Sequence, residues 1–139
     1  MSTVRTLARL ARILEHSSND LSMPQYRLLA MVAEGDERAS ALAGRLTLSK
    51  PTITAAVDGL VERGLVTRGD VAGDRRAVRI TITAAGRRAL QAAERSMQER
   101  LNGILTHCAD RAAVEQALDQ LGDALDAVLA ERLREGASR

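Results

Sequence analysis

The sequence predicts a mainly helical α+β fold, and two observations carry that prediction. Apolar residues recur every three to four positions through most of the chain, which is typical of amphipathic helices. Between residues 65 and 82 the period changes to two, which is typical of strands. A chain of 139 residues is long enough for one hydrophobic core and too short for two independent ones. We therefore expect a single domain covering residues 1–139.

The first two helices are predicted from their spacing and their ends. Residues 2–16 have apolar side chains at helical spacing and are followed by the turn-forming residues 17–20. A second helix is expected after Ser22 and Met23, with Pro24 tolerated in its first turn, and Gly35 ends it. Each helix thus has one apolar face to bury.

Two further helices follow a pair of candidate N-caps, Ser40 and Ser49, whose hydroxyl groups suit that position. In the later of these helices, Pro51 falls in the first turn, where it loses no hydrogen bond, and Gly64 follows the last turn as a left-handed C′ residue. Its apolar stripe is expected at Ile53, Ala56, Val57, Leu60 and Val61. The opposite face carries small or polar side chains at Lys50, Thr52, Thr54, Ala55 and Asp58.

Two strands are predicted at residues 65–68 and 78–82, joined by a turn-forming stretch that contains glycine and aspartate. We expect Arg75 and Arg76 at the tip of this hairpin, with Asp74 holding one of them through a charge-assisted bond. A solvated pair of turn residues is the alternative. Two adjacent cations repel each other, however, so this arrangement favours contact with an anion.

Two long helices are predicted after the candidate caps Thr83 and Asp110. Apolar residues recur every seven positions, at 90, 97 and 104 and again at 114, 121 and 128, and such a seam packs against another helix. The two helices could cover each other within one chain. Helices of about 25 residues extend about 35 Å, beyond the remaining small module, so we favour a twofold dimer. Residues 2–18 and 89–136 are expected to form this intertwined dimerisation region.

The charge is distributed unevenly along the chain. Residues 40–88 carry nine cations against four anions, whereas residues 110–139 carry four cations against seven anions. A cationic segment suits a polyanionic partner, although such a surplus alone is also compatible with a solvated face. Tyr26 is the only aromatic residue, so the stacking platforms that bind single-stranded nucleic acid are missing. Duplex DNA is therefore the favoured polyanion.

The composition also bears on location and on redox chemistry. No apolar stretch approaches the roughly 18 residues of a membrane span, and arginines interrupt the apolar N-terminus, so we expect a cytoplasmic protein without a signal peptide. Cys108 is the only cysteine and lies on the predicted apolar stripe of the fifth helix, where packing is favoured over redox sensing. His16 and His107 are far apart in sequence, so no metal site is predicted.

The order helix, turn, helix, hairpin within residues 22–88 is that of a winged helix-turn-helix DNA-binding module. In such a module the second helix of the pair enters the major groove N-terminus first. Lys50, Thr52 and Thr54 suit that helix because small or polar side chains let it approach the base edges. The hairpin arginines suit the narrow minor groove, whose negative potential attracts guanidinium groups. The candidate DNA-binding residues are Ser40, Ser49, Lys50, Pro51, Thr52, Thr54, Ala55, Asp58, Asp74, Arg75 and Arg76.

About half of the chain, residues 21–90, resembles the MarR family of bacterial transcription regulators. The segments that carry the resemblance are Leu42–Leu46, Ser49–Thr54, Leu60–Val66, Asp74–Val78 and Ile82–Gly86. The flanking helices match that family's dimerisation region in order and length. The resemblance implies a homodimer that binds a palindromic operator, usually as a repressor. The helix from Lys50 to Asp58 would lie in the major groove, and Arg76, the third residue of the family's D-x-R signature, in the minor groove.

The resemblance also implies an effector, since many members lose DNA affinity when a small phenolic or lipophilic molecule binds between the dimerisation helices and the DNA-binding module. Tyr26 and Arg27 are the candidate polar contacts for such a ligand. The sequence departs from the family at Ala55, where members often have an arginine, so one DNA contact is expected to be missing. Peroxide-sensing members have a reactive cysteine in the first helix, and this helix has none.

Three functions compete on these grounds. The favoured one is a sequence-specific, dimeric DNA-binding regulator that needs no cofactor. The alternative is a ligand or redox sensor with a vestigial wing that acts by contacting another protein, and salt-dependent operator binding would separate the two. An enzyme is disfavoured because the sequence has no nucleotide-binding glycine motif, no paired metal ligands and no Ser/His/Asp set in a strand-turn-helix context.

Overall fold

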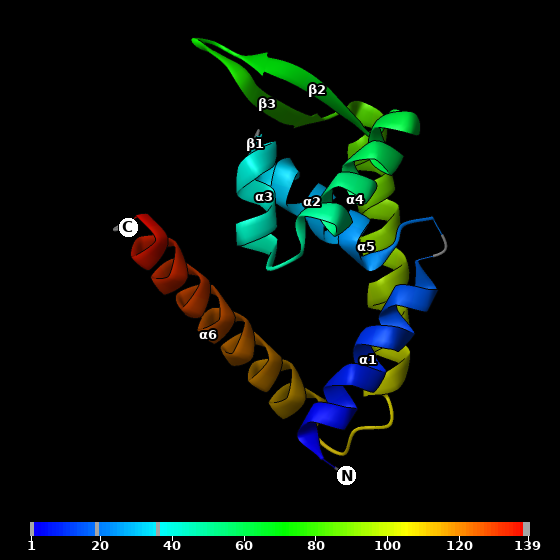
Figure 1. Cartoon of the computed structure of the whole chain (residues 1–139). Coiled ribbons are helices and arrows are strands. Elements are labelled where there is room, and N and C mark those ends of the chain that lie inside the picture. Colours follow the sequence, from blue (N-terminus) through cyan, green and yellow to red (C-terminus); the bar gives the residue numbers. More distant parts are fainter. Residues whose placement is uncertain (1, 19, 36, 138–139) are drawn as a thin grey trace. The chain divides into compact units, whose positions relative to one another are not determined.

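The structure, a computed structural model, describes residues 2–18, 20–35 and 37–137. The chain divides into two compact units, Met1–Arg100 and Leu101–Arg139. Among the described residues, no helix combines the length and the apolar character needed to cross a membrane. In chain order the elements are α1 (Thr3–Ser17), α2 (Met23–Glu34), β1 (Glu37–Arg38), α3 (Ala39–Leu46), α4 (Lys50–Glu62), β2 (Val66–Val71), β3 (Asp74–Ile82), α5 (Ala84–Leu105) and α6 (Arg111–Ala137) (Figure 1).

Side-chain caps fix the starts of four helices, and the sequence predicts three of them, at Ser49, Thr83 and Asp110. In each case an oxygen of the cap accepts the backbone N–H of the residue three positions later, at 3.0–3.3 Å. The caps are Ser22 on α2, Ser49 on α4, Thr83 on α5 and Asp110 on α6. Each cap satisfies an N–H group that has no partner within its helix.

The predicted cap at Ser40 is wrong. Helix α3 begins at Ala39, so Ser40 lies inside the helix, and Arg38 occupies the N-cap position without a side-chain cap. The physical reason is the preceding strand β1, which pairs with β3 and holds Glu37 and Arg38 extended directly before the first helical turn.

The sheet has three antiparallel strands in the order β1-β3-β2. Its hairpin is longer than predicted, because β2 continues to Val71 and β3 already starts at Asp74. The turn consists of residues 72 and 73, and Gly73 adopts a φ of 79°, which glycine reaches without steric cost. Arg75 and Arg76 therefore lie on the first residues of β3, beside the tip and not on it.

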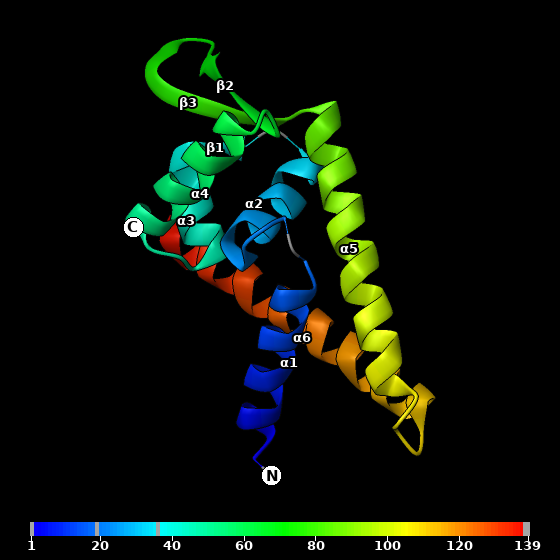
Figure 2. The ribbon, with the colours of Figure 1, turned by 90° about the vertical axis from the view of Figure 1, so that its right-hand side faces the viewer.

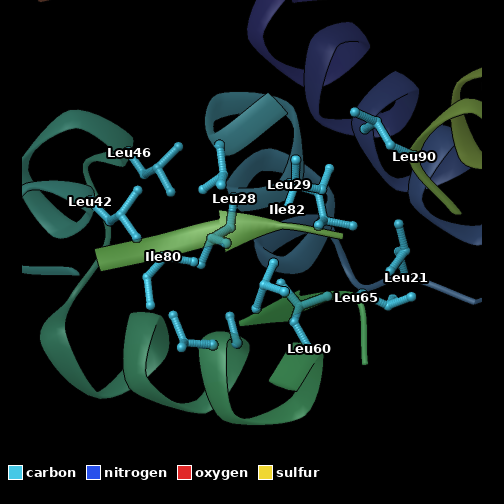
Figure 3. Close-up of a cluster of buried hydrophobic side chains, with 14 of the residues drawn as sticks. Leu21, Leu28, Leu29, Leu42, Leu46, Leu60, Leu65, Ile80, Ile82 and Leu90 are labelled. Carbon is cyan, nitrogen blue, oxygen red and sulfur yellow. The ribbon is translucent and has the colours of Figure 1, made fainter. Parts of the chain in front are cut away.

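One hydrophobic core lies between β3 and the helices of the unit Met1–Arg100. Figure 3 shows leucines of α2, α3 and α4 gathered around β3, where Ile80 is fully buried. Leu90, Ala93 and Met97 of α5 join this core. This part of the predicted seven-residue seam is therefore covered within the chain itself.

The start of α5 is held directly against the end of α4. Gly64 follows α4 with a φ of 70°, which confirms the predicted left-handed C′ residue. The Thr83 hydroxyl donates to the carbonyl oxygen of Gly64 at 2.7 Å, and the Thr83 N–H donates to that of Leu65 at 3.0 Å. A Cβ on Gly86 would overlap the carbonyl oxygen of Leu65. These contacts, which we call the α4–α5 joint, require a glycine in the first turn of α5.

Helices α1 and α6 keep large apolar side chains in contact with solvent. On α1, Val4 is 73% exposed and Leu7 42%. On α6, exposed apolar side chains recur at Leu121, Leu125, Val128 and Leu133. Among the described residues, no side chain of α1 or α6 is buried, whereas Ser18, which directly follows α1, is buried.

The sequence places Cys108 on the apolar stripe of the fifth helix, and the structure corrects this. Helix α5 ends at Leu105, so Cys108 lies in the connection to α6, where it is half-buried. Its backbone N–H donates to the carbonyl oxygen of Leu105 at 3.1 Å. The expected helical stripe ends one turn earlier than predicted.

Candidate nucleic-acid interface

Helix α4 presents most of the candidate DNA-binding residues to solvent. Its apolar stripe is buried at Ile53, Ala56, Val57 and Leu60, as predicted. The Ser49 and Thr52 hydroxyl oxygens are 2.8 Å apart at the N-terminus of the helix. On the face turned away from the core, the exposed residues are Lys50, Pro51, Thr54, Ala55 and Asp58. Thr52, at the edge of this face, is half-buried.

Two grooves flank α4 and divide its candidate residues between them. The first, which we call the wing groove, has a volume of about 380 Å³ and lies between α3, α4 and the sheet. Its polar lining residues are Ser40, Lys50, Thr54 and Arg68, and its apolar ones include Val57 and Val78. The second groove, of about 490 Å³, joins Pro51, Thr52 and Ala55 of α4 to the start of α2.

Arg68 is a candidate site residue that the sequence analysis missed. It lies on β2 and forms an ion pair with Asp58 of α4, between Nη2 and Oδ1. Both side chains are largely exposed, at 44% and 58%. The signal that could have found Arg68 is the alternation along β2, because Arg68 is paired with the buried Ile80 and so shares the sheet face that meets α4.

Asp74 organises the part of the hairpin next to the turn through its two carboxylate oxygens. Oδ1 accepts the backbone N–H of Arg76 at 3.0 Å, and Oδ2 lies 3.8 Å from Nη1 of Arg38 on β1. Asp74 thus holds Arg76 through its backbone, whereas the sequence analysis expects a bond to an arginine side chain. The guanidinium it pairs with is that of Arg38, which lies on a strand that the sequence did not predict.

The cations of the sheet lie close to one another. Arg38 and Arg79 are directly opposite in the β1–β3 pairing, and both are exposed. Arg75 and Arg76 are also exposed, on the part of β3 that follows the turn. Figure 2 shows the β2–β3 hairpin extending away from α3 and α4. Like charges directly opposite on a sheet destabilise it. The arrangement therefore favours an anionic partner over water alone.

Tyr26 and Arg27, the candidate ligand contacts, both have protein partners. Arg27 donates from Nη2 to the carbonyl oxygen of Leu46 at 2.6 Å, at the end of α3. The Tyr26 hydroxyl donates to Glu94 on α5 at 3.5 Å. Burial, and then the charge of Glu94, raise the pKa of Tyr26 above its usual value. The hydroxyl is therefore neutral at physiological pH.

A third groove, of about 510 Å³, lies next to α1. It is lined by Arg12, Ile13, His16, Ser17 and Arg100. The Nδ1–H group of His16 donates to the carbonyl oxygen of Arg12 at 2.8 Å. Within residues 2–18, 20–35 and 37–137, no group of three His, Cys, Asp or Glu side chains could hold a metal ion.

A helix pair with an exposed polar face, followed by a cationic antiparallel hairpin, defines a winged helix-turn-helix protein. The MarR family model matches residues 19–77. A curated relative, the uncharacterized HTH-type transcriptional regulator YpoP of Bacillus subtilis (strain 168), is 38% identical over 73 residues, which are 52% of this chain and 52% of that protein. The chain thus spans about half the length of the curated relative it matches.

Solved structures extend the likeness over most of the chain. The transcriptional regulator BldR from Sulfolobus solfataricus has a TM-score of 0.71 and 28% identity, covering 91% of this chain and 99% of that one. Wild-type MarR from E. coli, in its apo form, has the same fold with a TM-score of 0.72, 18% identity and coverage of 90% and 96%. Residues 19–77 of this chain are thus similar to the MarR family, and the rest of the chain shares the fold of these solved structures. The solved structures confirm the predicted fold class, and the family model and the curated relative, an HTH-type transcriptional regulator, agree with the predicted family.

Proposed function

We propose that this chain is a sequence-specific regulator of transcription that binds duplex DNA as a homodimer at a palindromic operator. The observation that carries the proposal is the wing groove, in which Lys50 and Thr54 of α4 lie next to Arg68 and Val78 of the cationic hairpin. An exposed polar helix and a cationic hairpin on one surface suit adjacent grooves of a duplex.

The two parts of this surface have different roles in the proposal. Helix α4 lies in the major groove, where Lys50 and the two threonines contact base edges or phosphates. The hairpin lies along the adjacent minor groove, where Arg75 and Arg76 meet its negative potential. With Ala55 on the exposed face of α4, no long side chain projects from that position.

The dimer belongs to the proposal as well. Residues 22–88 form the DNA-binding module, and residues 2–18 and 89–136 form the dimerisation region of one MarR-type domain. Exposed apolar side chains on α1 and α6 support this division, because they do not stabilise the protein unless another surface buries them. A twofold dimer places two modules on half-sites about one helical turn, or about 10 bp, apart.

We further propose that the protein acts in the cytoplasm as a repressor, by occluding a promoter, and that a small phenolic or lipophilic molecule releases it. The family supports repression and release. The neutral, half-buried Tyr26 hydroxyl supports a phenolic or lipophilic ligand, because it offers a hydrogen bond without burying a charge.

Selection of bound fragments from genomic DNA with the purified chain tests the proposal. The expected result is one enriched palindromic sequence with a steep dependence of affinity on salt, since each neutralised phosphate contributes about 0.9 to the log-log slope. A chain that enriches no sequence and ignores duplex DNA would contradict the proposal.

Charge reversal on the hairpin tests the assignment of the wing. We expect Arg76→Glu to lower duplex affinity by at least about tenfold and to reduce the salt slope by about 0.9 or more. The matched control is Arg95→Glu, which changes the net charge equally at an exposed position of α5. If both variants bind DNA equally well, the hairpin is not a DNA contact.

A further inference from the structure

Arg68 extends the polar stripe of α4 although it lies on another element. Lys50, Thr54 and Asp58 follow one another at intervals of four residues, so they form a stripe along one side of the helix. The third position is acidic, and a carboxylate there repels the phosphates of DNA. The ion pair with Arg68 places a guanidinium group at this end of the stripe.

The chemistry of the pair favours a base edge over a phosphate as its DNA contact. The paired charges of Arg68 and Asp58 cancel, so together they attract phosphates weakly. Arginine has five N–H donors, and the bond from Nη2 to Asp58 leaves most of them available. These donors have a fixed planar geometry that matches the O6 and N7 acceptors of guanine in the major groove.

We propose that Arg68 reads a guanine in the major groove and that Asp58 is its positioning residue. This inference rests on the proposed function, since it assumes that α4 enters the major groove. Asp58 keeps the guanidinium of Arg68 close to Lys50 and Thr54. Arg68, Lys50 and Thr54 all line the wing groove. Arg68 thereby contributes to the choice of sequence more than to general affinity for DNA.

The test uses the full-length protein and the operator that the wild-type chain selects. Affinity is measured for this operator, for variants with each base pair replaced, and for an unrelated duplex. Arg68→Ala is expected to lose discrimination at one G·C pair in each half-site by roughly 5- to 150-fold, which is the range of a bidentate contact. In Arg68→Ala/Asp58→Ala, which removes the pair without leaving a net charge, binding to the unrelated duplex and its salt slope are expected to stay within twofold and within about 0.3 of wild type.

Two further variants separate geometry from charge. Arg68→Lys keeps the charge but lacks the planar fork, so it is expected to lose the same discrimination. Asp58→Asn frees the arginine and removes a negative charge, so operator affinity is expected to fall while affinity for the unrelated duplex rises. Asp58→Glu keeps the carboxylate and is expected to restore part of the discrimination. A role in folding alone would not produce opposite changes for the two duplexes.

The exposed pair contributes little to stability, so these variants are expected to fold, which a thermal unfolding midpoint within about 2 °C of wild type would confirm. Arg95→Ala, at an exposed position of α5 outside the apolar seam at residues 90, 97 and 104, serves as the control for loss of one exposed arginine. If Arg68→Ala keeps the wild-type base preference, or lowers affinity equally for all sequences with a salt slope reduced by about 0.9, the inference is wrong. If the wild-type chain selects no sequence, the proposed function itself has failed.

Discussion

At the scale of single residues, the carboxylate of Asp74 connects Arg38 of β1 to the backbone of Arg76 on β3. It accepts the backbone N–H of Arg76 at 3.0 Å and lies 3.8 Å from Arg38. We expect Asp74→Ala to release the Arg76 amide, because a hydrogen bond of this kind contributes about 1 kcal/mol. The Arg76 amide should then exchange with solvent about fivefold faster, as measured by NMR hydrogen exchange.

Asp74→Asn is the matched control for that prediction. Asparagine keeps the side-chain oxygen that accepts the Arg76 N–H but removes the negative charge. The Arg76 amide should stay protected in this variant, while affinity for an unrelated duplex should rise. Equal exchange rates in the alanine and asparagine variants would show that the Asp74 bond does not order the hairpin.

Residue-level features were predictable where they depend on near neighbours. The caps at Ser22, Ser49, Thr83 and Asp110 each act on a backbone group three residues away, so the sequence contains the whole interaction. The ion pair of Asp58 with Arg68 joins a helix to a strand, and its existence depends on how the two elements pack. Alternation along β2 indicates the sheet face on which Arg68 lies, but its pairing with Asp58 follows only from the packing of the two elements.

At the scale of elements, the α4–α5 joint depends on one glycine. A methyl group on Gly86 would overlap the carbonyl oxygen of Leu65, which is a backbone atom and cannot turn aside. We expect Gly86→Ala to destabilise the protein by about 3 kcal/mol, the upper part of the usual range for overpacking. Denaturant unfolding followed by circular dichroism measures this loss.

Gly103 supplies the control because it lies in the same helix with nothing within 4 Å of the position of a Cβ. Gly103→Ala should leave stability unchanged or raise it by up to about 1 kcal/mol, since alanine favours helix more than glycine does. A Gly86→Ala variant as stable as Gly103→Ala would mean that the α4–α5 joint adapts to the added methyl group.

The elements that the sequence did not predict are those formed by pairing. Strand β1 has only two residues, Glu37 and Arg38, which are too few to show a period and which gain their structure from β3. The hairpin is longer than predicted for the same reason, because Gly69 and Asp70 are poor strand formers that the pairing with β3 nevertheless holds extended. The long helices, with many turns of consistent spacing, were predicted in full apart from their ends.

At the scale of the whole molecule, the exposed apolar side chains of α6 lead to a prediction about assembly. Leu121 and Leu125 are 42% and 62% exposed, and a twofold interface would bury both in each copy. We expect Leu121→Asp/Leu125→Asp to weaken the dimer by at least about 1000-fold, because each buried leucine contributes about 1.5–3 kcal/mol. Sedimentation velocity at about 10 µM should then show a monomer.

Gln120→Asp is the control for this experiment, since it adds a charge at an exposed position of α6 away from the predicted seam. It should leave the sedimentation coefficient unchanged. Operator affinity should fall for the double leucine variant but not for the control, because one module alone contacts one half-site. A wild-type chain that is monomeric at this concentration would contradict the proposed dimer.

The α4–α5 joint also limits how far the proposed dimer can adapt to a changed spacing between its two half-sites. A duplex turns by about 35° for each base pair, so one inserted pair between two half-sites rotates one of them away from its module. The contacts at Gly64, Leu65 and Gly86 hold the end of α4 against the first turn of α5, so α4 cannot rotate relative to α5 at this point. The proposed dimer would therefore be as sensitive to a changed rotation between its half-sites as to a changed base. A spacer longer by one whole turn would keep that rotation, so only the long helices would have to span the added distance.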